Sequence, residues 1–408
     1  MALIVQKYGG SSVGTIDRIR NVARRLIETR NAGNRVVAVV SAMSGITDKL
    51  IGMAHEVMDN PPERELDMLM ATGEQQSIAL LCMAITEMGY KARSFTGRQA
   101  GIFTYGSHTR GRIRSIDASA VTKALEDGCI CVCAGFQGVN NEGSIQTLGR
   151  GGSDLSAIAL ASAVKADLCQ IYTDVDGVYT CDPRVVKDAR KIPVISYDEM
   201  LEMASSGSKV MQARSVEFAK KFGVVFEVRN SMNNNPGTIV QEETSAMESL
   251  VIRGVSIERN QARVTVSDIT APVAYTAIIL SALAEAEINV DMIVANTAHD
   301  GRARQSFTMN MNDLGAAQAA LKKLLPQFGE GAKLETEAGL AKLSVVGVGM
   351  RSNPGVAATL FRSLADAGIA TGMIATSEIR ITTTVEAADI EQAARVVHEA
   401  FNLDKAQA

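Results

Sequence analysis

The chain has 408 residues, too many for one ordinary hydrophobic core, so two or three domains are predicted. Hydrophobic residues make up 46% and charged residues 21%, a balance typical of globular proteins. The 41 basic and 45 acidic residues are well mixed, Trp is absent and aromatic residues make up only 4%, so no nucleic-acid partner is expected.

The termini and apolar runs give no export or membrane signal. The chain begins directly with the strand-like run 3–5, and no basic region precedes a long apolar stretch, so no signal peptide is expected. A membrane span needs roughly 18 consecutive apolar residues. The longest apolar runs, such as 276–284, are shorter. We therefore expect a cytoplasmic protein without a membrane partner.

The six cysteines and four histidines do not predict a metal site. Cys129, Cys131 and Cys133 alternate, so on a strand they would face one side. A metal or redox site is one interpretation, and packing as small apolar side chains is the other. Packing is favoured, because no CxxC pair occurs and the histidines match no ligand spacing. Unpaired cysteines also fit a reducing cytoplasm.

Strand-like and helix-like segments alternate through the first half of the chain. Continuous apolar runs between amphipathic segments are typical of a mainly parallel sheet with helices on both faces. Strands are predicted at 3–7, 35–41, 129–134 and 168–173, and helices at 12–30, 66–88 and 153–164. The polar stretch 231–247, with its Pro-Gly turn, predicts a linker. The α/β domain is accordingly placed at residues 1–245.

The rest of the chain contains an internal repeat. Residues 283–296 align without gaps with residues 364–377, at an offset of 81 residues. Each copy reads as strand, loop, helix, strand, strand and helix, which predicts two small ferredoxin-like α/β modules. We place these modules at residues 246–335 and 336–408.

Two glycine turns follow the same design, a strand leading through glycines into a helix. The first is 7–12 (Lys-Tyr-Gly-Gly-Ser-Ser) and the second is 149–154 (Gly-Arg-Gly-Gly-Ser-Asp). Glycines let a polyanion approach the backbone, and a helix N-terminus offers free N–H groups with partial positive charge. A structural turn, or a cap supplied by Ser153 or Asp154, is the alternative. The pair of turns together favours phosphate binding.

A third motif, 173–184 (Thr-Asp-Val-Asp-Gly-Val-Tyr-Thr-Cys-Asp-Pro-Arg), follows a strand end, where open α/β sheets bind ligands. Neither GxxxxGK[ST] nor a full GxGxxG with a following acidic residue occurs, so neither a P-loop nor a dinucleotide fold is predicted.

In combination, these motifs resemble the aspartate kinases. The resemblance also includes 40–47 (Val-Ser-Ala-Met-Ser-Gly-Ile-Thr), 72–74 (Thr-Gly-Glu) and 135–138 (Gly-Phe-Gln-Gly), and it covers nearly the whole chain. It implies an amino-acid kinase fold followed by two ACT modules. It also implies transfer of the γ-phosphoryl group of ATP to the side-chain carboxylate of L-aspartate, giving 4-phospho-L-aspartate in lysine, threonine and methionine biosynthesis.

The resemblance implies roles for individual residues. Lys7, Asp154 and Arg150 would be catalytic, with Arg150 gripping the α-carboxylate of aspartate. Of Glu74 and Asp154, one would pair with the α-ammonium of aspartate and the other with Lys7, and the resemblance leaves open which pairs with which. The remaining substrate contacts would be Ser41, Thr47, Phe136, Gly151, Gly152 and Ser153. The nucleotide contacts would be Lys7, Tyr8, Gly9, Gly10, Thr173, Asp174, Tyr179, Arg184 and Lys209. Mg²⁺ bridging the phosphates is expected from the chemistry, although no protein ligand set is visible.

Lysine, threonine or both are the effectors that the resemblance implies, bound where ACT modules pair in a homo-oligomer. The effector contacts would be Asp268, Ala274, Ile288, Asn289, Val290, Asp291, Asn296, Ile374, Ala375 and Glu378. Departures from the family occur in both modules: 271–273 (Ala-Pro-Val) replaces the usual Pro-Gly turn, and 369–373 (Ile-Ala-Thr-Gly-Met) differs from its counterpart 288–292. These changes leave the number of effector sites open. Met247 is a candidate internal start for a separate regulatory subunit.

Three other functions remain as alternatives. A kinase for glutamate or acetylglutamate is disfavoured by the paired ACT modules together with 149–154. A non-catalytic amino-acid sensor would not need two phosphate-binding turns. A dehydrogenase fused to ACT modules is disfavoured by the missing dinucleotide fingerprint.

Overall fold

A computed structural model describes residues 1–207, 210–243, 251–270, 273–297, 301–348, 350 and 353–405. The chain forms two compact units. The first comprises Met1–Val178, Lys191–Ala204 and Lys209–Met247, and the second comprises Tyr179–Arg190, Ser205–Ser208 and Glu248–Ala408. The second unit therefore takes two short segments from within the range 1–245 predicted for the first domain.

The first unit is built on a sheet whose described strands run in the order β10-β12-β11-β9-β1-β2-β6-β3. Among these strand pairs, β11 and β12 run antiparallel and the others are parallel. The strands are β1 (Leu3–Tyr8), β2 (Arg35–Val40), β3 (Ala92–Phe95), β6 (Ile130–Ala134), β9 (Leu168–Thr173), β10 (Val194–Ser196), β11 (Phe226–Asn230) and β12 (Thr238–Gln241). The predicted mainly parallel α/β sheet is confirmed.

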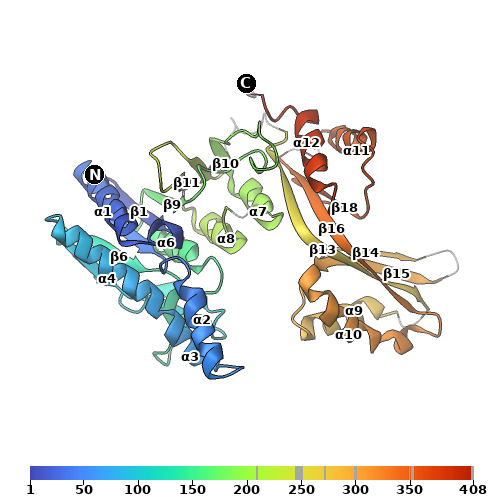
Figure 1. Ribbon diagram of the computed structural model, residues 1–408, viewed down its shortest axis with the longest axis horizontal. Helices are drawn as coiled ribbons and strands as arrows, with labels where there is room; N and C mark the ends of the chain where they lie inside the picture. The colour runs from blue at the N-terminus through green and yellow to red at the C-terminus, as the bar shows by residue number, and fades with distance from the viewer. Residues whose placement is uncertain are drawn as a thin grey trace. The chain divides into compact units, whose positions relative to one another are not determined.

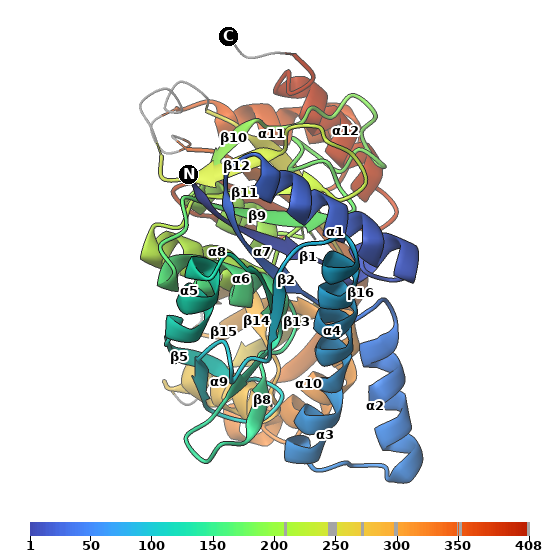
Figure 2. The same ribbon diagram turned by 90° about the vertical axis from the view of Figure 1, so that its left-hand side faces the viewer.

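Helices cover both faces of this sheet. α1 (Ile16–Asn31) and α4 (Thr72–Glu87) lie side by side on one face, where their apolar residues pack against alternate residues of β2 and β6 (Figures 1 and 2). α6 (Gly152–Ala163) packs against β1 and β9, and nearly all of its side chains are buried. The remaining helices of the unit are α2 (Ile46–Val57), α3 (Glu63–Met70), α5 (Ser119–Glu126), α7 (Tyr197–Ser205) and α8 (Ala213–Phe222).

Two predicted helices have different bounds in the structure. The helix predicted at 12–30 starts at Ile16, because residues Gly10–Ser12 form a 3₁₀ turn and the Thr15 side chain accepts from Arg18 N as the N-cap. The helix predicted at 66–88 is divided into α3 and α4 at Ala71. The Ala71 carbonyl accepts from Gln137 Nε2 at 2.9 Å, and its helical bond from Gln75 N is stretched to 3.4 Å. The periodicity of the sequence gives no information on the contact between Ala71 and Gln137, which are 66 residues apart.

The stretch Glu63–Glu87 is long and apolar enough to cross a membrane by length and composition alone. Half of its most apolar window is buried within the protein, and Ile78, Leu81 and Ile85 belong to the core between α1 and the sheet. These features are those of a core helix.

A second, smaller sheet in the first unit was not predicted. Its strands run in the order β5-β4-β7-β8 and are β4 (Ile102–Tyr105), β5 (Arg112–Ile116), β7 (Gln137–Val139) and β8 (Ile145–Thr147). Each strand has only three to five residues, too few for alternation to stand out in the sequence. β8 leads directly into the second glycine turn.

The second unit contains a sheet of order β14-β15-β13-β16-β18-β17. Its first module comprises β13 (Gly254–Ile269), α9 (Tyr275–Glu285), β14 (Val290–Thr297), β15 (Ala303–Asn310) and α10 (Leu314–Lys322). The second comprises β16 (Lys333–Val346), α11 (Val356–Asp366), β17 (Ile374–Thr376), β18 (Arg380–Glu386) and α12 (Ile390–Ala400). The predicted order of elements is confirmed in both copies (Figure 1). α9 and α11 begin at Tyr275 and Val356, which is the predicted offset.

The two modules share their long central strands. The first half of β13, residues 254–258, pairs with the last residues of β16, whereas the second half of β13 pairs with the first residues of β16. Ile252 and Val255 accordingly lie in the hydrophobic core of the second module. A module boundary drawn at a single residue, as at 335, therefore divides a continuous strand.

The segment 179–190 is anchored in the core of the second unit. Cys181, Val185 and Val186 are buried in the cluster that contains α11 and α12. Val255 N donates to Thr180 O at 2.7 Å, and the Thr180 hydroxyl lies 2.9 Å from His398 Nε2. His398 is only 2% exposed.

We expect His398 to make the second unit sensitive to acid. Burial lowers the pKa of His398 in the folded protein. The unfolded chain then binds the proton more readily, so stability present above the unfolded value of about 6.5 is lost as the pH falls. Melting temperatures between about pH 7.5 and 5.5 should fall less steeply for His398→Gln than for the native chain. His55→Gln, at an exposed histidine, is the matched control; equal slopes in all three proteins would refute the assignment.

Candidate active site

The first glycine turn lies at the C-terminal end of β1. Lys7 is 8% exposed, and its Nζ forms an ion pair with Asp154 Oδ1 at 2.6 Å. Gly10 is required by space, since a Cβ there would lie 2.9 Å from Ala42 O. The close approach brings the turn against the residues that follow β2, and Ser41 N donates to Tyr8 O at 3.1 Å.

The second glycine turn connects β8 to α6. Gly149 and Gly151 have φ of 75° and 70°, which glycine adopts without strain. α6 begins at Gly152 and carries Asp154 in its first turn. Because Asp154 pairs with Lys7, the N-terminal turn of α6 lies beside the end of β1, and the two glycine turns meet. Arg150 is exposed, and no hydrogen-bond or ionic partner for it occurs among the described residues.

Glu74 is buried in the first turn of α4, with 2% of its surface exposed. Its Oε1 accepts from Ala42 N at 3.0 Å, whereas Oε2 has no hydrogen-bond partner in the described part of the chain. Burial raises the pKa of Glu74 to about 7, against the opposing effect of the Ala42 bond. A buried carboxyl with one free oxygen is suited to receive a cationic group.

Phe136 and Ser153 lie at the second turn. Phe136 is half-buried with φ of 66°; its N donates to Ser156 Oγ at 3.1 Å and its carbonyl accepts from Leu148 N at 2.8 Å. A Cβ on Gly135 would lie 2.8 Å from Ser153 Oγ. Thr47 is half-buried in the first turn of α2. Of the predicted substrate residues, Ser41 thus contacts the first glycine turn, and Phe136 and Ser153 lie at the second. Glu74 reaches the first turn only through Ala42.

The predicted nucleotide residues are divided between the two units. Thr173 is the last residue of β9, which pairs with β1, and Asp174 follows it. The Thr173 hydroxyl donates to Asp174 Oδ1 at 3.1 Å. Tyr179 and Arg184 lie in the segment 179–190 of the second unit. Arg184 pairs with Asp182 at 2.7 Å and lowers the pKa of that carboxyl. Lys209 lies outside the described residues.

The predicted effector residues lie in three places of the second unit. Asp268 ends β13, where Lys333 and Arg302 pair with it and lower its pKa, and Ala274 precedes α9. Residues 288–291 and Asn296 lie on or beside β14, while Ile374, Ala375 and Glu378 lie on or beside β17. β14 and β17 form opposite edges of the sheet, so one chain does not bring these groups together. Ala271 and Pro272 lie outside the described residues.

Lys342 on β16, which no sequence motif predicted, is 5% exposed. Its Nζ pairs with Asp291 Oδ2 at 2.5 Å and with Glu258 Oε2 at 3.3 Å. In the sequence, Lys342 stands out only as a lysine within an apolar strand. This pattern does not indicate which acidic residues pair with it.

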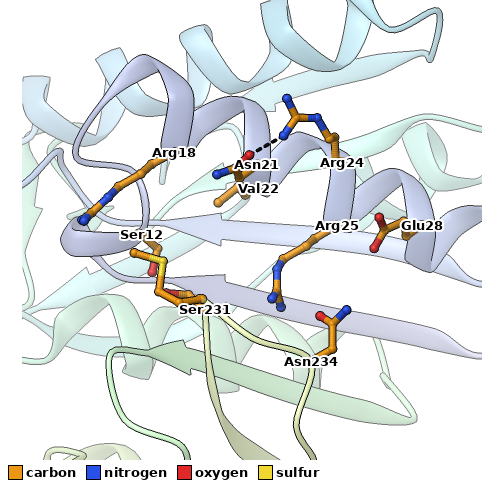
Figure 3. Close-up of a pocket in the computed structure, with 10 residues that line it drawn as sticks. Ser12, Arg18, Asn21, Val22, Arg24, Arg25, Glu28, Ser231 and Asn234 are labelled. Atoms are coloured by element: carbon orange, nitrogen blue, oxygen red, sulfur yellow. Dashed lines mark hydrogen bonds between the residues drawn. The ribbon is translucent and has the colours of Figure 1, made fainter.

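A basic cavity of about 260 Å³ lies between α1 and residues 231–234 (Figure 3). Arg18, Arg24 and Arg25 line it, and none of its lining residues is among the predicted aspartate or nucleotide contacts. Arg18 donates to Ser11 O, and Arg25 donates to Asn233 O at 2.6 Å. These two guanidinium groups therefore connect α1 to the turn that precedes it and to residues 231–234.

Comparisons with known proteins agree with this architecture. Residues 2–230 match the amino acid kinase family, and residues 343–401 match an ACT domain. An aspartokinase of Geobacillus stearothermophilus is 51% identical over 403 residues, covering 99% of this chain and 98% of its own. Aspartokinase 2 of Bacillus subtilis is 48% identical over 405 residues, covering 99% of both chains.

Solved structures give the same result. Aspartokinase III of E. coli in complex with aspartate and ADP, in the R-state, superposes with a TM-score of 0.80 at 25% identity, covering 98% of this chain and 99% of that one. The same enzyme in complex with lysine and aspartate, in the T-state, has a TM-score of 0.78 at 25% identity, covering 99% of this chain and 100% of that one.

Proposed function

Because the chain belongs to the amino acid kinase family and, within it, to the aspartokinases, we propose that its two glycine turns hold ATP and L-aspartate for phosphoryl transfer. The chain is an aspartate kinase, an ATP-dependent enzyme of amino-acid biosynthesis. The product is 4-phospho-L-aspartate. The observation that supports this site most strongly is the Lys7–Asp154 ion pair, which joins the turns.

Phosphoryl transfer to aspartate requires electrostatic stabilisation of the transition state and no general base. A free aspartate side chain has a pKa of about 3.9, so the attacking carboxylate is already ionised at neutral pH. The barrier arises because one anion must approach another, and positioning with charge neutralisation lowers it. Lys7 supplies the cation, and the N–H groups of Gly9 and Gly10 hold the transferring phosphoryl group. Asp154 holds the Lys7 ammonium in place.

Arg150 and Glu74 grip the two α-groups of aspartate. The exposed guanidinium of Arg150 can make a bidentate pair with the α-carboxylate. Since Asp154 is the partner of Lys7, Glu74 is left for the α-ammonium. Its unpartnered Oε2 supports this division of roles. Ser41, Thr47, Phe136, Gly151, Gly152 and Ser153 complete the substrate pocket.

ATP is the phosphoryl donor. Besides Lys7, Gly9 and Gly10, the residues that the resemblance assigns to it are Tyr8, Thr173, Asp174, Tyr179, Arg184 and Lys209. Mg²⁺ would supply charge neutralisation at the phosphates. No group of three His, Cys, Asp or Glu side chains suited to a metal occurs in the described ranges. In kinase sites Mg²⁺ is generally bound through substrate phosphates and water, with one or two carboxylates.

Feedback control acts through the second unit. Lysine, threonine or both are the effectors, consistent with the lysine complex of the E. coli relative. Since β14 and β17 are opposite edges of one sheet, a homo-oligomer that pairs sheet edges would unite the two groups of effector residues. The kinase domain would lie within residues 1–245, without the segments 179–190 and 205–208 that belong to the second unit. The two ACT modules, drawn at 246–335 and 336–408, would share the strands β13 and β16. An internal start at Met247 would yield a regulatory subunit. The enzyme would act in the cytoplasm.

Aspartate binding is expected to weaken as the pH falls through about 7. Burial raises the pKa of Glu74 to about 7, and only the ionised form attracts an ammonium group. The KM for aspartate should therefore rise about tenfold by about pH 6, while the KM for ATP changes little. Glu74→Gln should show a high KM for aspartate with no such pH dependence. A native pH slope retained by this variant would contradict the role of Glu74.

The function is tested by trapping the acyl phosphate with hydroxylamine. The full-length chain is supplied with ATP and Mg²⁺ and, in separate reactions, with aspartate, glutamate or acetylglutamate. Of the three acceptors, only aspartate should give hydroxamate. Addition of lysine, threonine or both should lower the rate of hydroxamate formation. Faster hydroxamate formation with glutamate or acetylglutamate would identify that acceptor, and not aspartate, as the substrate. Absence of hydroxamate with all three acceptors would reject the catalytic proposal in favour of a sensor.

A further inference from the structure

A buried carboxylate that no motif singled out lies behind the second glycine turn. Asp67, on α3, is fully buried. Its Oδ1 accepts from the Thr147 hydroxyl at 2.5 Å, and its Oδ2 lies 2.7 Å from His108 Nδ1. Thr109 N donates to both oxygens, at 3.1 and 3.0 Å. An ionised carboxylate only accepts, so the His108 Nδ1 is assigned the proton.

One donor to Asp67, Thr147, leads directly into the second glycine turn, which carries Arg150. Thr147 is the last residue of β8, and Leu148 and Gly149 separate it from Arg150. Gly111 N donates to Thr147 O at 2.8 Å. Arg214 donates to Leu148 O and to Gly111 O, both at 2.9 Å. The stem of the second turn is therefore held on both sides, by Asp67 and by Arg214.

The other end of the connection leads to Glu74. α3, which carries Asp67, continues through Ala71 into the first turn of α4, where Glu74 lies. Gln137 Nε2 donates to Ala71 O at 2.9 Å, and Gln137 is paired with Thr147 across β7 and β8. The α3–α4 junction and the end of β8 are thus joined at two points, Asp67–Thr147 and Ala71–Gln137.

We propose that Asp67, together with His108 and Thr147, is a positioning group that sets the separation of Arg150 and Glu74. It touches neither substrate nor the reacting atoms. The α-carboxylate and α-ammonium of aspartate are bonded to one carbon, so the distance between them is fixed. Arg150 and Glu74 can therefore contact both groups together only if their side chains are held at the matching distance. This inference rests on the proposed roles of Arg150 and Glu74 in binding aspartate.

The test replaces Thr147 by Val, which keeps the side-chain shape and removes the hydroxyl bonded to Asp67. The KM for aspartate should rise by up to about tenfold, which is reached when the whole energy of one hydrogen bond to a charged group is expressed in the spacing of Arg150 and Glu74, while the KM for ATP stays within about twofold. Thr147→Ser restores the hydroxyl and should restore the KM for aspartate. Asp67→Asn and His108→Ala should show the same selectivity for aspartate over ATP.

Thr104→Val is the matched control. Thr104 is also buried in the small sheet and donates to Gln146 Oε1 at 2.8 Å, but it does not contact Asp67. It should lower the melting temperature comparably and leave the KM for aspartate unchanged. Equal changes in KM for aspartate and ATP in Thr147→Val, or equal effects of the two valine variants, would overturn the inference. A native chain that forms no aspartyl hydroxamate rejects the proposed function instead, so the two failures are distinguishable.

Discussion

Lys7→Ala is expected to lower kcat for aspartate phosphorylation by about 10³-fold or more. The variant removes the cation that is proposed to lie beside the transferring phosphoryl group, and loss of one preorganised electrostatic contact costs about 10²–10³ in rate. Loss of a buried counter-charge adds to this, because Asp154 remains without its 2.6 Å partner. Lysine binding by the second unit should be preserved, since none of its predicted contacts involves Lys7.

Stability and catalysis must be separated in that experiment. Lys7→Ala leaves a nearly buried carboxylate unpaired and should lower the melting temperature. Lys7→Ala combined with Asp154→Asn removes both charges, and it should recover much of the stability but none of the turnover. The measurements are hydroxamate formation at saturating substrates, thermal melting and calorimetric lysine binding. Near-native turnover in Lys7→Ala would falsify the assignment of Lys7.

Arg150→Ala should raise the KM for aspartate by about 100-fold, with a smaller change in the KM for ATP. A bidentate pair with a carboxylate contributes two charge-assisted hydrogen bonds, and each is worth about 1.5–3 kcal/mol. Arg150→Lys should recover only part of this affinity, because an ammonium cannot reproduce the planar two-point contact. Arg150 is exposed and makes no hydrogen bond or ion pair with any of the described residues, so little loss of stability is expected.

Arg24→Ala is the control for Arg150. It removes an exposed guanidinium from the basic cavity beside α1, outside the predicted aspartate site. Its KM for aspartate should stay close to the native value. If Arg24→Ala and Arg150→Ala raised this KM equally, general positive charge and not a specific carboxylate contact would explain the binding.

The position of segment 179–190 bears on regulation. Tyr179 and Arg184, assigned to ATP by resemblance, lie in a segment whose Cys181, Val185 and Val186 are part of the core of the second unit. A chain ending near Met247 would expose these apolar residues. Loss of feedback in such a truncation would therefore be accompanied by disturbance of the nucleotide segment, and variants of the full chain are the cleaner test.

The sequence by itself determined the elements and the family. Helix and strand periods depend on residues two to four positions apart, so β1, β2, β6, β9 and α6 were predicted within one or two residues. The repeat predicted the two modules for the same reason, since each copy carries its own local pattern. Motif order along the chain identified the aspartate kinases, because it too is readable without distances.

Only the tertiary structure decided which charges meet. Lys7 pairs with Asp154 and not Glu74, Asp67 binds Thr147, and Lys342 pairs with Asp291, in each case across many residues. The division of α3 from α4 and the sharing of β13 between modules likewise depend on distant partners. Such contacts form when folding excludes water from groups far apart in the chain, and the cost of an unpaired buried charge then selects the partner.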